Sequence, residues 1–224
     1  MERQSARWEE REQWPKRQAE LADLRFRKLL PAEDWRRLPA TVRRRFDKRL
    51  QGGDSAVYRG HVVETRMNVW GLMLAWTLRL IGAPLPVERC AGGTPAIVTV
   101  TEDPASCGQF WTRQYNRRRG FPQVIQSAKA FAGPTGLEEL VGAGVGMSLR
   151  LLVEGESLLF VSECYFLSIL RRRWHLPRWL APGHLVVGHH DLGAGWFEFT
   201  LDLNHPLLGE LLHQRARFRD MAEN

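Results

Sequence analysis

The densest group of residues able to do chemistry is a run of three histidines and one carboxylate: His184, His189, His190 and Asp191. Imidazole and carboxylate groups together can bind zinc or move protons. Side chains alternate on a strand, so His184 and His190 share one face while His189 points to the other. At most two imidazoles then converge, and a zinc site needs three or four protein ligands. The spacing favours a cluster at a strand end, with no bound metal.

Other catalytic patterns are incomplete. The segment Gly142–Gly146, GAGVG, resembles a dinucleotide-binding loop, but its third glycine comes one place early and a strand pattern follows it. Glu138 and Glu139 are adjacent and diverge on a strand, so they do not predict the paired carboxylates of a glycosidase. No serine lies in a G-x-S-x-G motif, and no cysteine has a histidine at motif spacing. The sequence therefore favours a protein without catalysis or cofactor. An enzyme that uses the His184–Asp191 region is an alternative.

Tryptophan is abundant, with nine residues, and several stand beside arginine. Indole rings favour the boundary between water and lipid, and arginine can pair with anionic head groups. The simpler interpretation is that the rings fill the core of a wide barrel. The residues that we expect to contact an apolar ligand or an anionic membrane are Trp70, Leu74, Trp76, Arg171, Arg172, Arg173, Trp174 and Trp179.

The composition suits one β domain and argues against nucleic acid as a partner. A length of 224 residues fits a single large β domain. The formal charge of +7 could serve phosphate binding, but no recognised nucleic-acid motif accompanies it. Arginine greatly outnumbers lysine beside abundant Leu, Ala and Gly, which is typical of a high-GC genome whatever the function.

Three further features predict a cytoplasmic protein. The cysteines are odd in number and widely spaced, which is not a disulfide framework. The N-terminus carries charge where a signal peptide needs an apolar segment. The most apolar window, Val69–Ile81, is shorter than the roughly 20 residues of a membrane span. A peripheral position at the inner face of the membrane is compatible with all three.

Hydropathy patterns divide the chain into three parts: a polar tail or frayed helix over residues 1–20, a helical lead-in over 21–50, and an antiparallel β domain over 51–220. In the lead-in, one helix should stop before Pro31, and a second should begin at Asp34 or after Pro39 and run through Phe46. Inside the β domain, Asn68 and Gly82 should cap a helix over Val69–Ile81 that is apolar almost all round.

Period-two alternation predicts an α+β fold that is mainly antiparallel β, a barrel or strongly curved sheet of about eight strands. Short connections between strands require antiparallel pairing. Phe197, Phe199, Leu201 and Leu203 alternate without a break and should face one core. The expected strands are 57–64, 96–102, 109–115, 124–131, 147–153, 158–166, 185–190 and 195–203, with 211–218 a strand or a helix.

Several ordered segments resemble the bacterial family of domain of unknown function 4166, over roughly residues 26–218. They are FRKLLPAEDWRRLPATVRRRFD, AVYRGHVVE, LIGAPLP, IVTVTED, FWTRQY and WFEFTLDLNHPLLGELLHQRARF. Members of that family occur alone or behind a part that resembles a nucleotide-binding oxidoreductase. The resemblance implies one β-rich domain and supplies no catalytic residues. It also leaves open an accessory role beside an oxidoreductase-like protein.

The sequence favours a non-enzymatic β-barrel domain that binds a lipid-like ligand or an anionic membrane surface. The helix over Val69–Ile81 and the connection over Leu170–Leu180 would form an apolar mouth ringed by cations, as in small β-barrels that hold one hydrophobic ligand. An accessory domain should instead have a solid core and a flat apolar patch. An enzyme should have a polar pocket in which the histidines or Glu163 converge.

Overall fold

The computed structural model describes residues 24–47, 50, 53–80, 82, 85–87, 91–104, 106–117, 119–170 and 172–220. The predicted polar tail of residues 1–20 lies outside the described residues, as does Arg171. The described part begins with three short helices and continues as antiparallel strands with one longer helix after the first strand. The predicted class, mainly antiparallel β with few helices, is confirmed.

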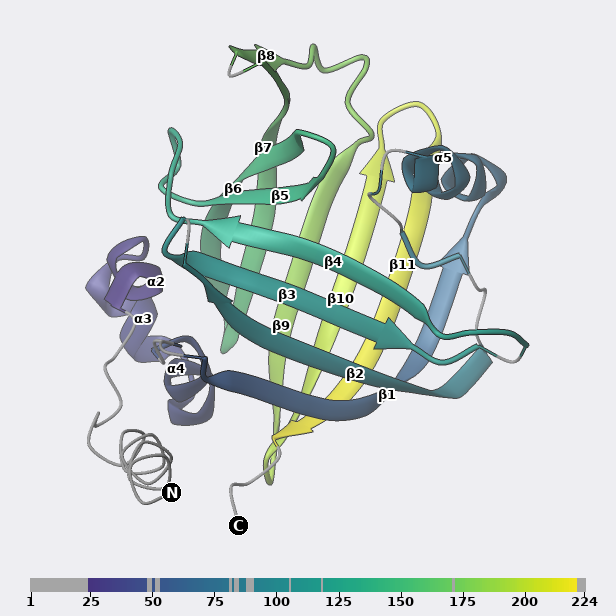
Figure 1. Cartoon of the computed structure of the whole chain (residues 1–224). Coiled ribbons are helices and arrows are strands. Elements are labelled where there is room, and N and C mark those ends of the chain that lie inside the picture. The colour runs from purple at the N-terminus through teal and green to yellow at the C-terminus, as the bar shows by residue number, and fades with distance from the viewer. Residues whose placement is uncertain are drawn as a thin grey trace, which may run out of the picture.

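The strands form a closed barrel (Figure 1). Their bounds are β1 Ser55–Met67, β2 Ala91–Asp103, β3 Gly108–Tyr115, β4 Gln123–Ala130, β5 Glu138–Gly142, β6 Val145–Glu154, β7 Ser157–Ile169, β8 Arg172–His175, β9 His184–Gly193, β10 Trp196–His205 and β11 Gly209–Asp220. Ten of them pair in the ring β1-β2-β3-β4-β5-β6-β7-β9-β10-β11, which closes where β11 meets β1. Strand β8 pairs with the end of β7 outside the ring.

The predicted count of about eight strands is too low. Three strands account for the difference. Two of them are short, β5 with five residues and β8 with four, so neither is long enough to show a period of two. The ambiguous last segment is a strand, β11, which joins β1 to β10 and so closes the barrel. A two-residue turn at Ala143-Gly144, both with positive φ, connects β5 to β6, so the glycine-rich GAGVG segment is a hairpin.

The predicted inward face of β10 is confirmed. Phe197 and Leu203 are fully buried in the core, and Phe199 and Leu201 are partly buried and pack against it. The same alternation on the neighbouring strands directs apolar side chains into the barrel.

Three helices cover one end of the barrel: α2 (Leu24–Lys28), α3 (Ala32–Arg37) and α4 (Ala40–Phe46) (Figure 1). Helix α3 ends at Arg37 because Leu38 precedes a proline and takes an extended conformation. The stretch from Asp34 to Phe46 is therefore two helices. Phe26 of α2 and Phe46 of α4 reach into the barrel, where each contacts Phe160 of β7 edge-on or tilted.

Helix α5 (Val69–Leu80) lies at the opposite end of the barrel (Figure 1). The predicted N-cap is confirmed: Oδ1 of Asn68 accepts a hydrogen bond from the Gly71 amide at 2.8 Å. A Cβ on Gly71 would lie 1.9 Å from the Leu211 carbonyl oxygen, so the glycine lets α5 pack directly on β11. Among the described residues, no helix combines the length and apolarity that a membrane crossing requires.

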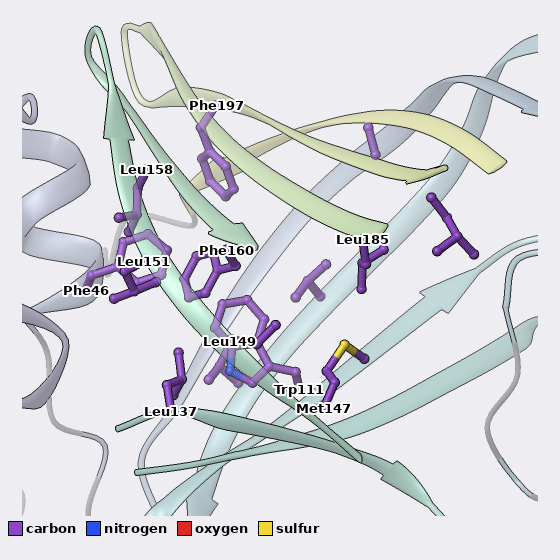
Figure 2. Close-up of a cluster of buried hydrophobic side chains, with 14 of the residues drawn as sticks. Phe46, Trp111, Leu137, Met147, Leu149, Leu151, Leu158, Phe160, Leu185 and Phe197 are labelled. Atoms are coloured by element: carbon purple, nitrogen blue, oxygen red, sulfur yellow. The ribbon is translucent and has the colours of Figure 1, made fainter. Parts of the chain in front are cut away.

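The half of the barrel beside α2–α4 is solidly packed. Figure 2 shows Phe46 reaching from its helix toward Leu151, Leu158 and Phe160 of the barrel wall. Arg45 completes this end, because its guanidinium lies 4.2 Å from the centre of the Phe197 ring and bonds to Asp191 and Asp220. Packed side chains of the described residues therefore occupy this end of the barrel.

Candidate functional site: the barrel cavity

The half of the barrel beside α5 holds a cavity of about 340 Å³. Trp111 of β3 lies between the two halves, since it lines this cavity and also a small one of about 20 Å³ that Phe26 and Phe46 line. Its ring meets Phe199 edge-on, with ring centres 6.1 Å apart. The barrel is therefore filled at one end and hollow at the other, and the hollow end is the candidate site.

Alternation along the strands makes the cavity wall apolar. Every second residue of a barrel strand points inward, so the strands that border the cavity line it mainly through one face. The apolar side chains from the strands are Val98, Trp111, Ile125, Val141, Val145, Met147, Leu167, Leu185, Val187, Phe199, Leu201, Leu203, Ala216 and Phe218.

The mouth of the cavity lies between two segments outside the ring. Helix α5 contributes Leu74 and Leu78, and the connection between β8 and β9 contributes Leu176 and Leu180. Leu180 lines the cavity and is also 56% exposed, so the cavity communicates with solvent beside it. The two segments that the sequence predicted to form an apolar mouth thus border one cavity.

Three charged side chains face the cavity from neighbouring strands: Arg113 of β3, Lys129 of β4 and Glu139 of β5. Lys129 and Glu139 are direct cross-strand partners, and Nζ of Lys129 donates to Oε2 of Glu139 at 2.8 Å. Nη2 of Arg113 donates to Oε1 of Glu139 at 3.2 Å and to the hydroxyl of Ser127 at 2.6 Å. Both oxygens of the one carboxylate are therefore occupied by cations.

Electrostatics keep the carboxylate of Glu139 ionised in a wall that is mostly apolar. Burial alone would raise the pKa of Glu139, but Lys129 and Arg113 outweigh it and hold that pKa at about 2. Burial lowers the pKa of Lys129, and the charge of Glu139 opposes that shift. The Lys129 ammonium also lies 5.1 Å from the centre of the Trp111 ring and makes a cation–π contact with it.

The polar part of the wall also includes two phenols, Tyr115 of β3 and Tyr165 of β7. Burial raises the pKa of both hydroxyls, to about 12 for Tyr165. Each stays neutral and able to donate a hydrogen bond. The site can thus solvate a small polar group at one place and surround an apolar chain elsewhere.

Comparison with known proteins places the chain in a family. The family described as Domain of unknown function (DUF4166) matches residues 38–218, most of the chain. The chain belongs to this family. No curated protein and no solved structure matches it.

The predicted contact residues of this DUF4166 domain divide into two sets. Leu74 lines the cavity, whereas Trp70 and Trp76 lie on the outer side of α5. Trp174 and Trp179 are exposed on β8 and on the connection that follows it. We call Trp70, Trp76, Trp174 and Trp179 the tryptophan rim. Each is between 52% and 79% exposed.

The predicted arginines differ in their surroundings. Arg172 is exposed at the start of β8, and Arg171 lies outside the described residues. Arg173 makes two hydrogen bonds, at 2.6 and 2.8 Å, to the buried carboxylate of Glu138. Its charge is therefore compensated within the DUF4166 domain, and it fixes β8 to β5.

The histidines of the sequence pattern do not converge. His189 is buried in the packed half, stacked on Phe197 with ring centres 4.9 Å apart. His190 faces the other way and bonds to the hydroxyls of Ser157 and Thr200. His184 is exposed. In the described ranges, His, Cys, Asp and Glu form no group of three that could hold a metal ion.

Sequence reasoning missed the polar cluster of the cavity, Arg113, Lys129 and Glu139. One signal was present: Ile125, Ser127 and Lys129 alternate on the face of β4 that points inward, so a lysine stood at a core position. Glu139 could not be assigned as its partner because β5 was not recognised as a strand.

Proposed function

We propose that this domain binds one apolar, lipid-like molecule in the barrel cavity. The observation that carries the proposal is the cavity of about 340 Å³, which lies within the packed barrel and is lined mostly by apolar side chains. Ligand pockets span roughly 300–1,000 Å³ and combine an apolar wall with a few polar groups. The size favours a single slender molecule, such as a medium-length acyl chain.

The energy of such binding comes from removing an apolar chain from water. Each buried methylene contributes about 0.8 kcal/mol, so affinity should rise about fourfold per added carbon until the chain fills the cavity. The wall is held by closed strand pairing, so little rearrangement opposes binding. Leu74, Leu78, Leu176 and Leu180 place apolar contacts along the route inward.

Displacement of a fluorescent fatty acid tests the proposal. We expect saturable binding of one molecule per chain. Met147→Trp, which fills part of the cavity from β6, should weaken binding at least tenfold. Leu152→Trp is the matched control, because Leu152 lies on the same strand, is 40% exposed and does not line the cavity. Absence of saturable binding by the unmodified protein, across a series of chain lengths, contradicts the proposal.

A second candidate function is contact with an anionic bilayer surface. The tryptophan rim supports it, because large exposed indoles beside the mouth are suited to the lipid–water boundary. A ligand could then pass from the bilayer to the cavity without crossing water. Co-sedimentation with vesicles tests this function. A protein partner that covers the same rim, such as an oxidoreductase-like protein, is the competing interpretation.

A further inference from the structure

The cavity wall has more positively than negatively charged side chains. Two cations and one carboxylate stand among the lining residues, so an ionised cluster carries one net positive charge. The carboxylate of Glu139 is fully engaged, because one oxygen accepts from Arg113 and the other from Lys129. No second carboxylate of a described residue lines this cavity.

Arg113 has N–H donors that make no hydrogen bond to a described residue. Its bonds to Ser127 and Glu139 both come from Nη2, so Nη1 and Nε make no hydrogen bond to any residue that the structure describes. The Arg113 side chain is 21% exposed, within a wall that is mostly apolar. A cation in such surroundings is stabilised by an anion that hydrogen-bonds to it, since buried charges are costly unless paired.

We propose that the ligand carries one acidic head group, a carboxylate, which enters the cavity and pairs with Arg113. This inference rests on the proposed function of the cavity. The single negative charge of a carboxylate neutralises the cluster, and one of its oxygens can accept a hydrogen bond from Nη1 of Arg113. The apolar tail extends toward the leucines of the mouth, so the molecule enters with its head group first.

Neighbouring groups favour this orientation. Tyr115 follows Arg113 on the inward face of β3, and its neutral hydroxyl is available as a further donor. The hydrogen bond to Glu139 and the cation–π contact with Trp111 fix the Lys129 ammonium in the cavity wall. It therefore adds positive charge close to the head group. A phosphate monoester, with nearly two charges, would exceed the single positive charge.

The test compares a fatty acid with the alcohol of the same chain length. We expect the acid to bind at least tenfold more tightly to the unmodified protein. Arg113→Gln should reduce that ratio to near one by weakening the acid alone. Glu139→Gln should raise the ratio, because the cluster gains positive charge. Arg150→Gln is the matched control, since Arg150 is 60% exposed and pairs with Glu163 away from the cavity.

The outcomes separate the two proposals. If acid and alcohol bind equally well to the unmodified protein, the acidic head group is wrong and the apolar cavity stands. If the acid is preferred and Arg113→Gln keeps the preference, the head group is not recognised here and the inference is overturned. If neither molecule binds, the proposed function itself fails. The ratios for the unmodified protein and for Arg113→Gln decide the question even if Glu139→Gln does not fold.

Discussion

The ring of His189 lies among Phe46, Phe197 and Phe199, in the packed half of the barrel. Burial lowers its pKa to about 3, and the nearby charge of Arg45 adds to the shift. The imidazole is therefore neutral at physiological pH, and its Nδ1 has no hydrogen-bond partner among the described residues. A residue type that suggested proton transfer in the sequence serves here as a flat core side chain.

His189 should make stability depend on pH. The unfolded chain takes up a proton at this residue below pH 6.5, whereas the folded protein does so only near pH 3. The contribution of neutral His189 is complete above pH 6.5 and declines as the pH falls toward 3. The free energy of unfolding should therefore drop by about 1.4 kcal/mol per pH unit below 6.5 because of this residue.

Urea unfolding between pH 7.5 and 5 measures this effect. His189→Leu should flatten the pH dependence by that amount, while exposed His184→Gln should keep the slope of the unmodified protein. Equal slopes for all three proteins would show that His189 is not buried in its neutral form.

At the scale of elements, predictability follows strand length. Except for β11, which the sequence left as a strand or a helix, strands of eight or more residues were located from their alternation, because burial on one face imposes a period of two. The short strands β5 and β8 gave no such signal, since β5 opens with two adjacent glutamates and β8 reads Arg-Arg-Trp-His. Glu138 pairs with Arg173 and Glu139 pairs with Lys129, on opposite sides of the barrel wall. These pairs follow from the strand pairing and could not be read from the sequence.

The candidate site was predictable only in part, for the same reason. The caps and apolar surface of α5 were evident in the sequence, and Leu74 does line the cavity. The cluster of Arg113, Lys129 and Glu139 depends on the order β3-β4-β5 and on the register between these strands. No local pattern encodes that order, so the acidic-ligand inference required the structure.

The rim elements, α5 and β8 with its following connection, carry a prediction about membranes. Replacing the four rim tryptophans by alanine should reduce binding to anionic vesicles at least tenfold with little loss of stability, because these side chains are exposed. The double variant Arg172→Gln and Arg178→Gln should lower the preference for anionic over neutral vesicles. Each cation near such a surface contributes about 1 kcal/mol, so added salt should weaken binding.

Vesicle co-sedimentation measures both effects, and Phe110→Ala is the matched control. Phe110 is an exposed aromatic residue next to the β2–β3 turn, which contacts Arg25 of α2 at the closed end of the barrel. If the unmodified protein binds the fluorescent fatty acid but no vesicles, the rim is a protein contact, and an accessory role with a partner replaces the membrane role.

The whole molecule is a container with one closed end. Helices α2–α4 and Arg45 close the barrel beside Phe160, and Trp111 lies between that packed half and the cavity beside α5 (Figures 1 and 2). We therefore expect stability and the proposed ligand binding to depend on different ends. The packed half supplies dense contacts between rings, and the hollow half can change its lining without loss of those contacts.

This division predicts opposite results for two truncations. Phe160→Ala removes a ring that touches Phe26 and Phe46, and it should destabilise the fold by about 3–5 kcal/mol without changing the preferred ligand length. Leu201→Ala removes a side chain that already borders the cavity, so it should cost only about 1–2 kcal/mol. The added space should shift the best-binding fatty acid to a chain longer by about two or three methylenes. Urea unfolding with displacement by a chain-length series measures both quantities. Equal destabilisation together with an unchanged length optimum would show that the two ends are not independent and that Leu201 does not contact the ligand.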